Sequence, residues 1–230
     1  MTSLRAICAA TFLLPSLLTA QGKPAPTPAA AGALLERTAR LYTGSRALRA
    51  AFTQRVKNPV TSSEMSSAGT YLQRGPGVFD VSFSQPSGDR IVSNGRTLWV
   101  FVPSATPGQV LKMAVGADAP GGVDLVGQFF TAPLRKFTVT DGGTAAVSGV
   151  TLRKLVLVPR AEMGLARAAL WVVPATGVLK QLQVTEHSGL VRTLTFTNIE
   201  RGVPLPAGAF TFTVPRGITV VDQAALSRGM

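Results

Sequence analysis

The sequence predicts a mainly β protein with short α-helices, in which one large, strongly curved antiparallel sheet carries the helices over its open side. Three observations predict this fold class. From residue 48 onward, most segments alternate apolar and polar side chains, which is the period of half-buried strands. Tight-turn dipeptides separate them, namely Asn94-Gly95, Asp141-Gly142 and Ser188-Gly189. Only two short segments show helical spacing, and the pattern fits both an incompletely closed barrel and a closed one.

Residues 1–20 have the features of a secretory signal peptide. The basic start "MTSLR" precedes an apolar run of thirteen residues, which is too short to span a membrane as a helix. The small residue Ala20 predicts cleavage before Gln21. The one cysteine of the chain, Cys8, lies within this segment. We therefore expect an exported, soluble mature protein without a thiol for disulfides, zinc binding or nucleophilic catalysis.

The mature chain is expected to begin with a linker and a helix. Residues 21–32, "QGKPAPTPAAAG", are rich in proline and alanine and predict an extended linker. The helix follows over Ala33–Tyr42 and ends at Thr43-Gly44-Ser45. Its apolar face consists of Leu34, Leu35, Thr38, Leu41 and Tyr42. We expect a single domain over residues 33–223 and a flexible tail over residues 224–230.

Twelve segments alternate with the period of strands: 48–56, 66–74, 77–85, 89–95, 96–103, 108–115, 135–141, 150–159, 166–174, 177–186, 190–200 and 209–215. The segment Pro120–Phe130 interrupts them with helical spacing after Asp124, a candidate N-cap. We expect a short helix here that lies over the sheet. Together with the first helix it would form a lid, and the expected lid residues are Leu34, Leu41, Val126, Phe129 and Phe130.

The strand within "RGPGVFDVSFSQP", residues 74–86, is half buried. Phe79, Val81 and Phe83 share an apolar face, and the opposite face is mostly polar. Phe79 follows the Gly-Pro-Gly turn at the start of the strand, so we expect it near the mouth of a cavity. Phe83 is expected deeper, where it would belong to the structural core.

The next strands carry more apolar surface than two short helices can cover. In residues 96–103, Trp99 and Phe101 share one face and the other face is also apolar. Each large apolar side chain left in water forfeits about 1.5–3 kcal/mol. The surplus predicts a lipid-binding cavity under the lid. Its expected lining residues are Phe52, Phe79, Val81, Phe83, Trp99, Phe101, Leu155, Leu157 and Leu170.

The sequence offers little that could perform catalysis. His187 is the single histidine and lies in the turn "TEHSG", and its neighbours along the chain point to opposite faces, so they do not build a triad. One histidine and scattered acids make a metal site improbable. Neither a cofactor nor a phosphate-binding glycine loop is indicated. A secreted hydrolase with a carboxylate pair stays open as an alternative, although nothing in the sequence points to one.

The chain is strongly basic, but its charge is dispersed. It has 23 lysines and arginines against 11 acids, a formal net charge of +12. These cations occur singly or in pairs, such as Arg135-Lys136 and Arg153-Lys154. Nucleic-acid-binding proteins gather such charge into a patch or along a helix, so we expect no nucleic-acid partner. A weak attraction to anionic lipid surfaces is compatible with the composition.

Four stretches together resemble the LolA family of periplasmic carriers of outer-membrane lipoproteins: "LRAAFTQRV", "RGPGVFDVSFSQP", "IVSNGRTLWVFVP" and "FTFTVPRGITVVDQ". The similarity runs from about Leu34 to Gln223. It implies an unclosed antiparallel β-barrel, or half barrel, with a helical lid and a cavity for acyl chains. It also implies a periplasmic, non-enzymatic chaperone, expected to be a monomer, that receives lipoproteins from an inner-membrane ABC transporter and passes them to an outer-membrane acceptor.

The resemblance also implies a latch for the lid. In the family, an arginine just before the proline of an Arg-Pro-x-x-Phe motif holds the lid, and Arg74 is the corresponding residue here. Gly75 stands between Arg74 and Pro76, so the arginine is displaced by one position. Such a shift turns a side chain to the other face of a strand unless a bulge absorbs it. Related folds imply two alternatives, a lipid or glycolipid carrier and a sensor domain in envelope-stress regulation.

Overall fold

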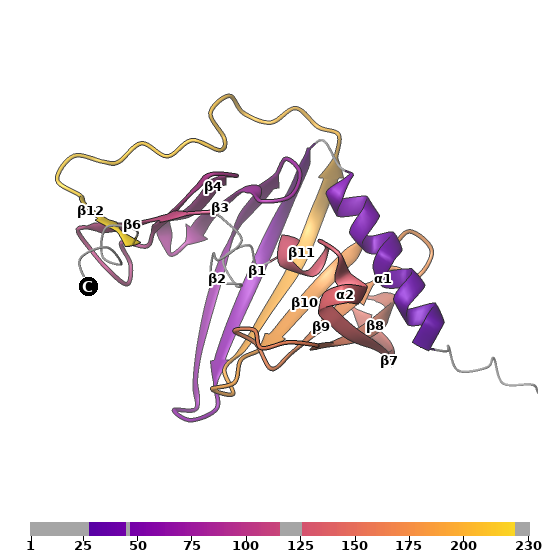
Figure 1. The fold of residues 1–230 in the computed structure, drawn as a ribbon. Helices are drawn as coiled ribbons and strands as arrows, with labels where there is room; N and C mark the ends of the chain where they lie inside the picture. The colour runs from indigo at the N-terminus through magenta and orange to yellow at the C-terminus, as the bar shows by residue number, and fades with distance from the viewer. Residues whose placement is uncertain (1–27, 45–46, 116–125, 224–230) are drawn as a thin grey trace, which may run out of the picture.

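The computed structural model describes residues 28–44, 47–115 and 126–223, which contain twelve strands and three helical elements (Figure 1). The strands are β1 (Leu48–Asn58), β2 (Ser63–Gln73), β3 (Val78–Gln85), β4 (Ser87–Asn94), β5 (Thr97–Phe101), β6 (Gln109–Ala114), β7 (Phe137–Val147), β8 (Val150–Pro159), β9 (Arg167–Val172), β10 (Leu179–Thr185), β11 (Val191–Arg201) and β12 (Thr219–Asp222). The helical elements are α1 (Pro28–Thr43), the 3-10 helix η1 (Gly127–Phe129) and α2 (Pro133–Lys136).

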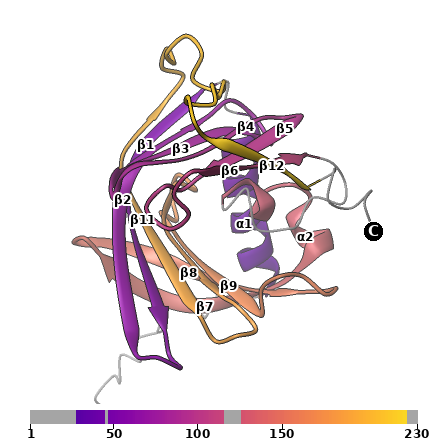
Figure 2. The same ribbon diagram turned by 90° about the vertical axis from the view of Figure 1, so that its left-hand side faces the viewer.

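All twelve strands belong to one open sheet, in the order β12-β6-β5-β4-β3-β2-β1-β11-β10-β9-β8-β7. Neighbouring strands are antiparallel, except that β12 runs parallel to β6. The sheet curls around α1, η1 and α2, and its edge strands β7 and β12 stay apart (Figure 2). This confirms the predicted fold class, an unclosed half barrel with a helical lid.

The sheet bends where strands lose their register. Bulges or irregularities interrupt the pairing of β1 with β11, β2 with β3 and β3 with β4, and such interruptions increase strand twist and curvature. Gly69 lies at one of them. A Cβ atom at this position would be 2.2 Å from the carbonyl oxygen of Ser82 and 3.0 Å from the Phe52 ring. Only glycine lets β2 and β3 approach so closely here.

Helix α1 begins at Pro28 rather than at the expected Ala33. Proline suits the first turn of a helix and alanine favours its continuation, so the end of the predicted linker is helical. Ala31 and Gly32 in this early part are buried. The apolar face of the predicted helix is present, with Leu35, Thr38 and Tyr42 among its buried residues.

The second predicted helix is only partly described. Asp124, the expected N-cap, lies outside the described residues, and η1 covers Gly127–Phe129. A further helical turn, α2, contains Arg135 and Lys136, which the alternating pattern assigned to a strand. That assignment was wrong, because Pro133 at the start of α2 favours the helix and β7 starts only at Phe137.

The predicted last strand, residues 209–215, is also wrong. Ala209 and Phe210 lie in a turn, residues 211–215 pair with no described strand, and the last described strand is instead β12. Phe210 and Phe212 alternate with exposed residues because the segment lies flat on the convex face of the sheet. Phe210 packs with Leu72 and Val78, while Arg90 donates a hydrogen bond to the carbonyl of Ala209 at 2.9 Å. Side-chain alternation therefore reflected packing on a face and not hydrogen bonding along an edge.

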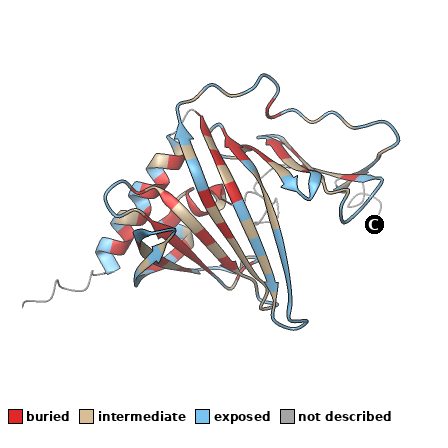
Figure 3. Cartoon of the chain, turned by 180° about the vertical axis from the view of Figure 1, so that it is seen from behind, coloured by how far each residue is buried: buried red, intermediate tan, exposed pale blue. Residues whose placement is uncertain are grey.

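The main core fills the concave side of the sheet, between the strands and the helical elements. Smaller apolar clusters lie on the convex side, one under the segment just described and one on β8 and β9 around Leu152 and Trp171. Seen from behind, the long central strands alternate between buried and exposed residues (Figure 3). The sheet therefore has one apolar concave face and a mixed convex face, and the site is on the concave one.

Candidate functional site

The concave face is built by the inward side chains of the central strands. On β3, Phe79, Val81 and Phe83 point inward as predicted, and on β8 and β9 Leu155, Leu157 and Leu170 are fully buried. Phe52 on β1 meets Phe83 edge to face, with ring centroids 5.4 Å apart. These seven predicted cavity residues belong to one continuous apolar cluster that also contains the lid residues.

The lid packs on this face through aromatic rings. Phe130 stacks on Tyr42 of α1 with centroids 4.7 Å apart and planes 17° apart. Phe129 is fully buried and packs on Phe137 at the start of β7, with centroids 5.6 Å apart. Val126 is buried in the same cluster, and the predicted lid residues Leu34 and Leu41 pack against it from α1.

Polar contacts tie the lid to the C-terminal half of the sheet. Arg37 of α1 donates a hydrogen bond to the carbonyl of Pro174, in the turn between β9 and β10. Arg160, after β8, donates to the carbonyls of Leu134 and Phe137, both at 3.2 Å, and so holds α2. The lid is therefore anchored beside β7–β10, while its contact with β1 and β2 is made by apolar side chains.

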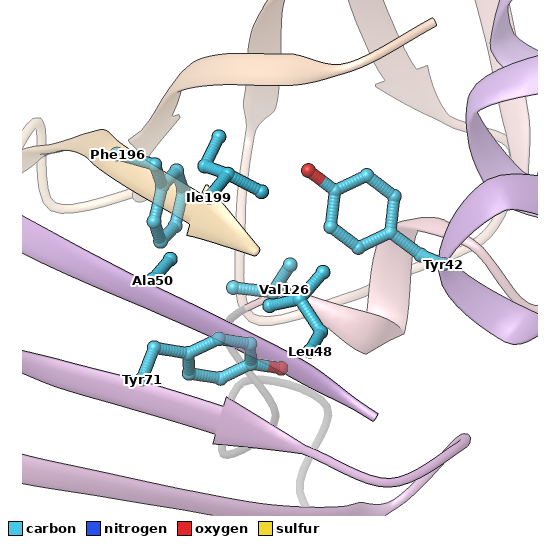
Figure 4. A pocket seen from close by; sticks show the side chains of 7 residues that line it. All are labelled: Tyr42, Leu48, Ala50, Tyr71, Val126, Phe196 and Ile199. Carbon is cyan, nitrogen blue, oxygen red and sulfur yellow. The ribbon is translucent and has the colours of Figure 1, made fainter. Parts of the chain in front are cut away.

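An apolar pocket lies between the lid and β1, β2 and β11 (Figure 4). Its empty space is about 190 Å³ and is too narrow to hold a water molecule. Pockets for small ligands usually measure about 300–1,000 Å³, whereas this one leaves no space for even a water molecule, so the lid is in a closed position here. The lining residues are Tyr42, Leu48, Ala50, Tyr71, Val126, Phe196 and Ile199.

The burial of Tyr42 shows how apolar this pocket is. Its hydroxyl group is 3.5 Å from the carbonyl oxygen of Leu179, a long contact that compensates little for lost hydration. Burial raises the pKa of the phenol strongly, because an ionised ring would be poorly solvated here. The pocket therefore disfavours charge and favours hydrocarbon.

Sequence reasoning missed most of the pocket residues. Of the residues that line the pocket, the sequence predicts only Val126 as part of the lid. The alternation within residues 48–56 and 190–200 does place Ala50 on the same face as Phe52, and Phe196 on the inward face of its own strand. The relative depth of the two phenylalanines on β3 was reversed. Phe79 is 3% exposed, whereas Phe83 is only half buried at the other end of its strand.

Trp99 and Phe101 do not line the cavity, contrary to the sequence prediction. On β5 it is Leu98 and Val100 that join the concave cluster. Trp99 and Phe101 lie on the convex face, where Phe212 covers them with ring centroids 5.5 and 5.7 Å away. β5 can be apolar on both faces because the segment around Phe212 shields the outer face from water.

Arg74 is not positioned as a lid latch. Its exposed guanidinium lies 5.1 Å from the ring centroid of Phe210, on the convex face. Tyr71 and Gln73 take the inward positions of β2, so the residue after Gln73 points outward. The insertion of Gly75, which has a positive φ of 78°, is the physical reason for the displacement.

We expect Arg74 to couple energetically with Phe210. A cation over an aromatic ring at an exposed site contributes about 0.5–1 kcal/mol. A double-mutant cycle of Arg74→Ala and Phe210→Ala, measured by urea unfolding, should give a coupling of this size. Strictly additive effects of the two substitutions would show that the contact contributes nothing to stability. Faster proteolysis within residues 126–136 in Arg74→Ala would show a loosened lid and would restore the latch role of Arg74.

A second, wider groove lies on the convex face, across β2, β1, β11 and β10. It opens to solvent, has a volume of about 570 Å³ and is lined by hydroxyl and amide side chains such as Thr53, Thr195 and Gln181. Thr53 follows the inward Phe52 on β1, and Thr195 precedes the inward Phe196 on β11. Since neighbouring side chains of a strand point to opposite faces, both threonines lie on the outer face. A polar, open groove suits hydrocarbon poorly.

The described residues offer no constellation for catalysis. Among them, no three histidine, cysteine, aspartate or glutamate side chains gather as metal ligands would. The ring nitrogen Nε2 of His187 lies 3.1 Å from the carbonyl oxygen of Met163, in an exposed turn. Within the same part of the chain, no helix has the length and apolarity needed to cross a membrane.

Comparisons with known proteins agree with this geometry. The family model described as "Outer membrane lipoprotein carrier protein LolA" matches residues 43–117. An outer-membrane lipoprotein carrier protein of Cupriavidus necator is 30% identical over 193 residues, which cover 79% of this chain and 84% of that protein. Another, of Vibrio parahaemolyticus, is 28% identical over 172 residues, 75% of this chain and 77% of that protein.

Two solved structures share the fold at low sequence identity. An uncharacterized conserved protein from Thermus thermophilus has a TM-score of 0.54 and 14% identity, with 84% of this chain and 99% of that chain covered. MucB has a TM-score of 0.50 and 15% identity, with 80% of this chain covered and 63% of the MucB chain. Both describe the architecture and carry no information on the ligand.

Proposed function

The chain belongs to the LolA family of outer-membrane lipoprotein carrier proteins, and on that premise we propose that it carries acylated lipoproteins across the periplasm by holding their acyl chains against the concave face of its sheet. The observation that supports this most is the apolar pocket under the lid. As a member of a carrier family, the protein binds and releases its cargo and is not an enzyme.

A carrier is needed because acyl chains are costly to expose. Each methylene group brought into water costs about 0.8 kcal/mol, so a chain of roughly fifteen methylenes costs on the order of 12 kcal/mol. Uncarried transfer between two membranes would therefore be very slow. The concave cluster, which combines Phe52, Phe83 and Phe196 with aliphatic side chains, provides the apolar surface that replaces water.

Binding requires the lid to move away from β1 and β2. The closed pocket does not admit even a water molecule, so Tyr42 and Val126 of the lid must first move away from the pocket residues on β1 and β2. Cargo binding then offsets the loss of these contacts, which keeps the net affinity moderate. Moderate affinity is what a carrier needs to accept cargo from an inner-membrane ABC transporter and release it to an outer-membrane acceptor.

The direct test is loading with a defined cargo. The purified mature protein is mixed with a synthetic diacylated lipopeptide or with the same peptide without acyl chains, and the complexes are identified by native mass spectrometry. We expect a stoichiometric complex with the acylated peptide alone. The protein isolated from the bacterial envelope should also yield bound lipoprotein. Absence of the acylated complex, together with failure to extract lipoproteins from membranes, would refute the proposal.

A further inference from the structure

A small group of polar side chains interrupts the apolar concave face toward one end of the central strands. On β1 the inward side chains run Ala50, Phe52, Gln54, Val56, and on β11 they run Phe196, Leu194, Arg192, with Val56 opposite Arg192. Phe52 lies opposite Phe196, Gln54 opposite Leu194, and Arg192 follows. One arginine therefore stands on the same face as the core, about 13 Å along β11 from Phe196 at roughly 3.3 Å per residue.

Hydrogen bonds hold Arg192 in this place. Its Nη1 donates to Oε1 of Gln54 at 3.3 Å, and Nε2 of Gln54 donates to Oγ of Ser67 at 3.1 Å. This chain of polar groups crosses from β11 over β1 to β2. Val184 of β10, which belongs to the apolar cluster, lies directly opposite Arg192 on its other side. The guanidinium is thus held on the apolar face, with Val56 and Val184 on its two sides.

The charge of Arg192 is not neutralised by a close carboxylate. None of the ion pairs within residues 28–44, 47–115 and 126–223 includes it. Burial lowers the pKa of its guanidinium, and the more distant Glu186 opposes this shift. A guanidinium has five N–H donors, so most of its donors are free for a ligand after the bond to Gln54.

We propose that Arg192 binds the phosphate group of a glycerophospholipid whose acyl chains lie along the apolar part of the concave face, so that this carrier also accepts phospholipid. The inference rests on the proposed function, because it takes the concave face as the acyl-chain site. Guanidinium and phosphate match in geometry, with paired N–H···O bonds that are stronger than neutral hydrogen bonds.

The position of Arg192 favours a lipid phosphate over an acidic group of the cargo protein. A phosphate esterified to glycerol is attached where the acyl chains end, and Arg192 stands where the apolar run of Phe196 and Leu194 on β11 ends. In an acylated protein the link between glycerol and the polypeptide is uncharged, and acidic side chains start farther away. The same site would therefore hold a phospholipid with its charge paired and a lipoprotein without this pairing.

The test compares ligands that differ only in the phosphate. Dioctanoyl phosphatidylglycerol and dioctanoylglycerol are titrated below their micelle-forming concentrations into the full mature protein by calorimetry. We expect phosphatidylglycerol to bind about tenfold more tightly or better, the effect of a hydrogen-bonded charged pair. Arg192→Gln should abolish this preference and leave dioctanoylglycerol binding unchanged. Arg192→Lys, which keeps the charge without the planar donor pair, should retain part of it.

Arg55→Gln is the matched control. Arg55 lies on the neighbouring β1, points to the opposite face and pairs with Glu64 at 3.0 Å, so its loss changes the net charge equally without touching the concave face. It should keep the phosphatidylglycerol preference. Equal binding of both lipids by the wild-type protein would overturn the inference, as would an equal loss of both in Arg192→Gln, which would indicate a merely structural arginine.

Two further ligands show whether Arg192 binds a lipid phosphate, a free phosphate or an acidic cargo protein. They also separate this inference from the proposed carrier function. Glycerol phosphate, the head group without chains, should bind far more weakly than phosphatidylglycerol, and equally tight binding would indicate a simple phosphate site. A diacylated lipopeptide should bind wild-type and Arg192→Gln equally. A preference for an acidic over a neutral lipopeptide that depends on Arg192 would assign the arginine to the protein cargo. Binding of lipopeptide without a phosphate preference refutes this inference alone, whereas failure of every acylated ligand refutes the proposed function.

Discussion

Phe79→Glu is expected to lower the free energy of unfolding by at least about 3 kcal/mol, whereas Phe83→Glu should lower it by about 1–2 kcal/mol. Truncation of a buried phenylalanine alone costs about 3–5 kcal/mol, and an unpaired buried carboxylate adds to this cost. Phe79 is 3% exposed within the concave cluster. Phe83 is half buried and loses mainly its edge-to-face contact with Phe52, which contributes about 0.5–1.5 kcal/mol. Urea unfolding of both variants measures the difference.

The two variants also separate folding from binding. Phe83→Glu should remain folded at 25 °C and lose the acylated lipopeptide, because it places a carboxylate on the concave face where hydrocarbon should lie. Phe83→Leu is the control, since it keeps the surface apolar and should keep binding. If Phe83→Glu destabilised the protein as much as Phe79→Glu, the whole inward face of β3 would be ordinary core.

A disulfide between β1 and the lid is expected to abolish cargo uptake. Ala50 of β1 and Val126 beside η1 line the same pocket, and a protein prepared from Gln21 onward lacks Cys8, the one cysteine of the sequence. In the double variant Ala50→Cys and Val126→Cys, oxidation joins the lid to the sheet and prevents the pocket from widening. We expect the oxidised protein to bind less than a tenth as much lipopeptide as the reduced protein, about 1.4 kcal/mol or more in apparent affinity. Native mass spectrometry of both forms measures this ratio.

The single-cysteine variants are the controls for the disulfide. Each should bind lipopeptide equally with and without reductant, which shows that oxidation acts through the cross-link alone. Thiol titration verifies that the disulfide has formed. Uptake by the fully cross-linked protein at the rate of the reduced one would mean that cargo enters somewhere other than between η1 and the central strands.

Period-two alternation was sufficient to predict which side chains share a face. It grouped Phe79, Val81 and Phe83 correctly, and it yielded the open sheet with helices on one side. It could not decide which face of β5 is inward, because both faces are apolar. That choice depends on Phe212, which lies far along the chain and covers Trp99 and Phe101 only in the folded protein.

Other errors have a common cause in backbone pairing. Alternation in residues 209–215 looked like a strand, yet the segment packs flat on the sheet and β12 forms after it.

The displaced Arg74 could be predicted, because one inserted residue turns a side chain to the opposite face. Arg192 could have been found as well, since the spacing within 190–200 places it on the face of Leu194 and Phe196.

Photocross-linking from the cargo shows directly whether acyl chains lie on the concave face under the lid. A lipopeptide that carries a diazirine at the end of an acyl chain is bound to the wild-type protein and irradiated, and the cross-linked residues are identified by mass spectrometry. We expect cross-links to inward residues such as Phe52, Tyr71 and Phe196, which belong to the apolar cluster. Cross-links confined to the outer groove, at Thr53 and Thr195, would contradict it.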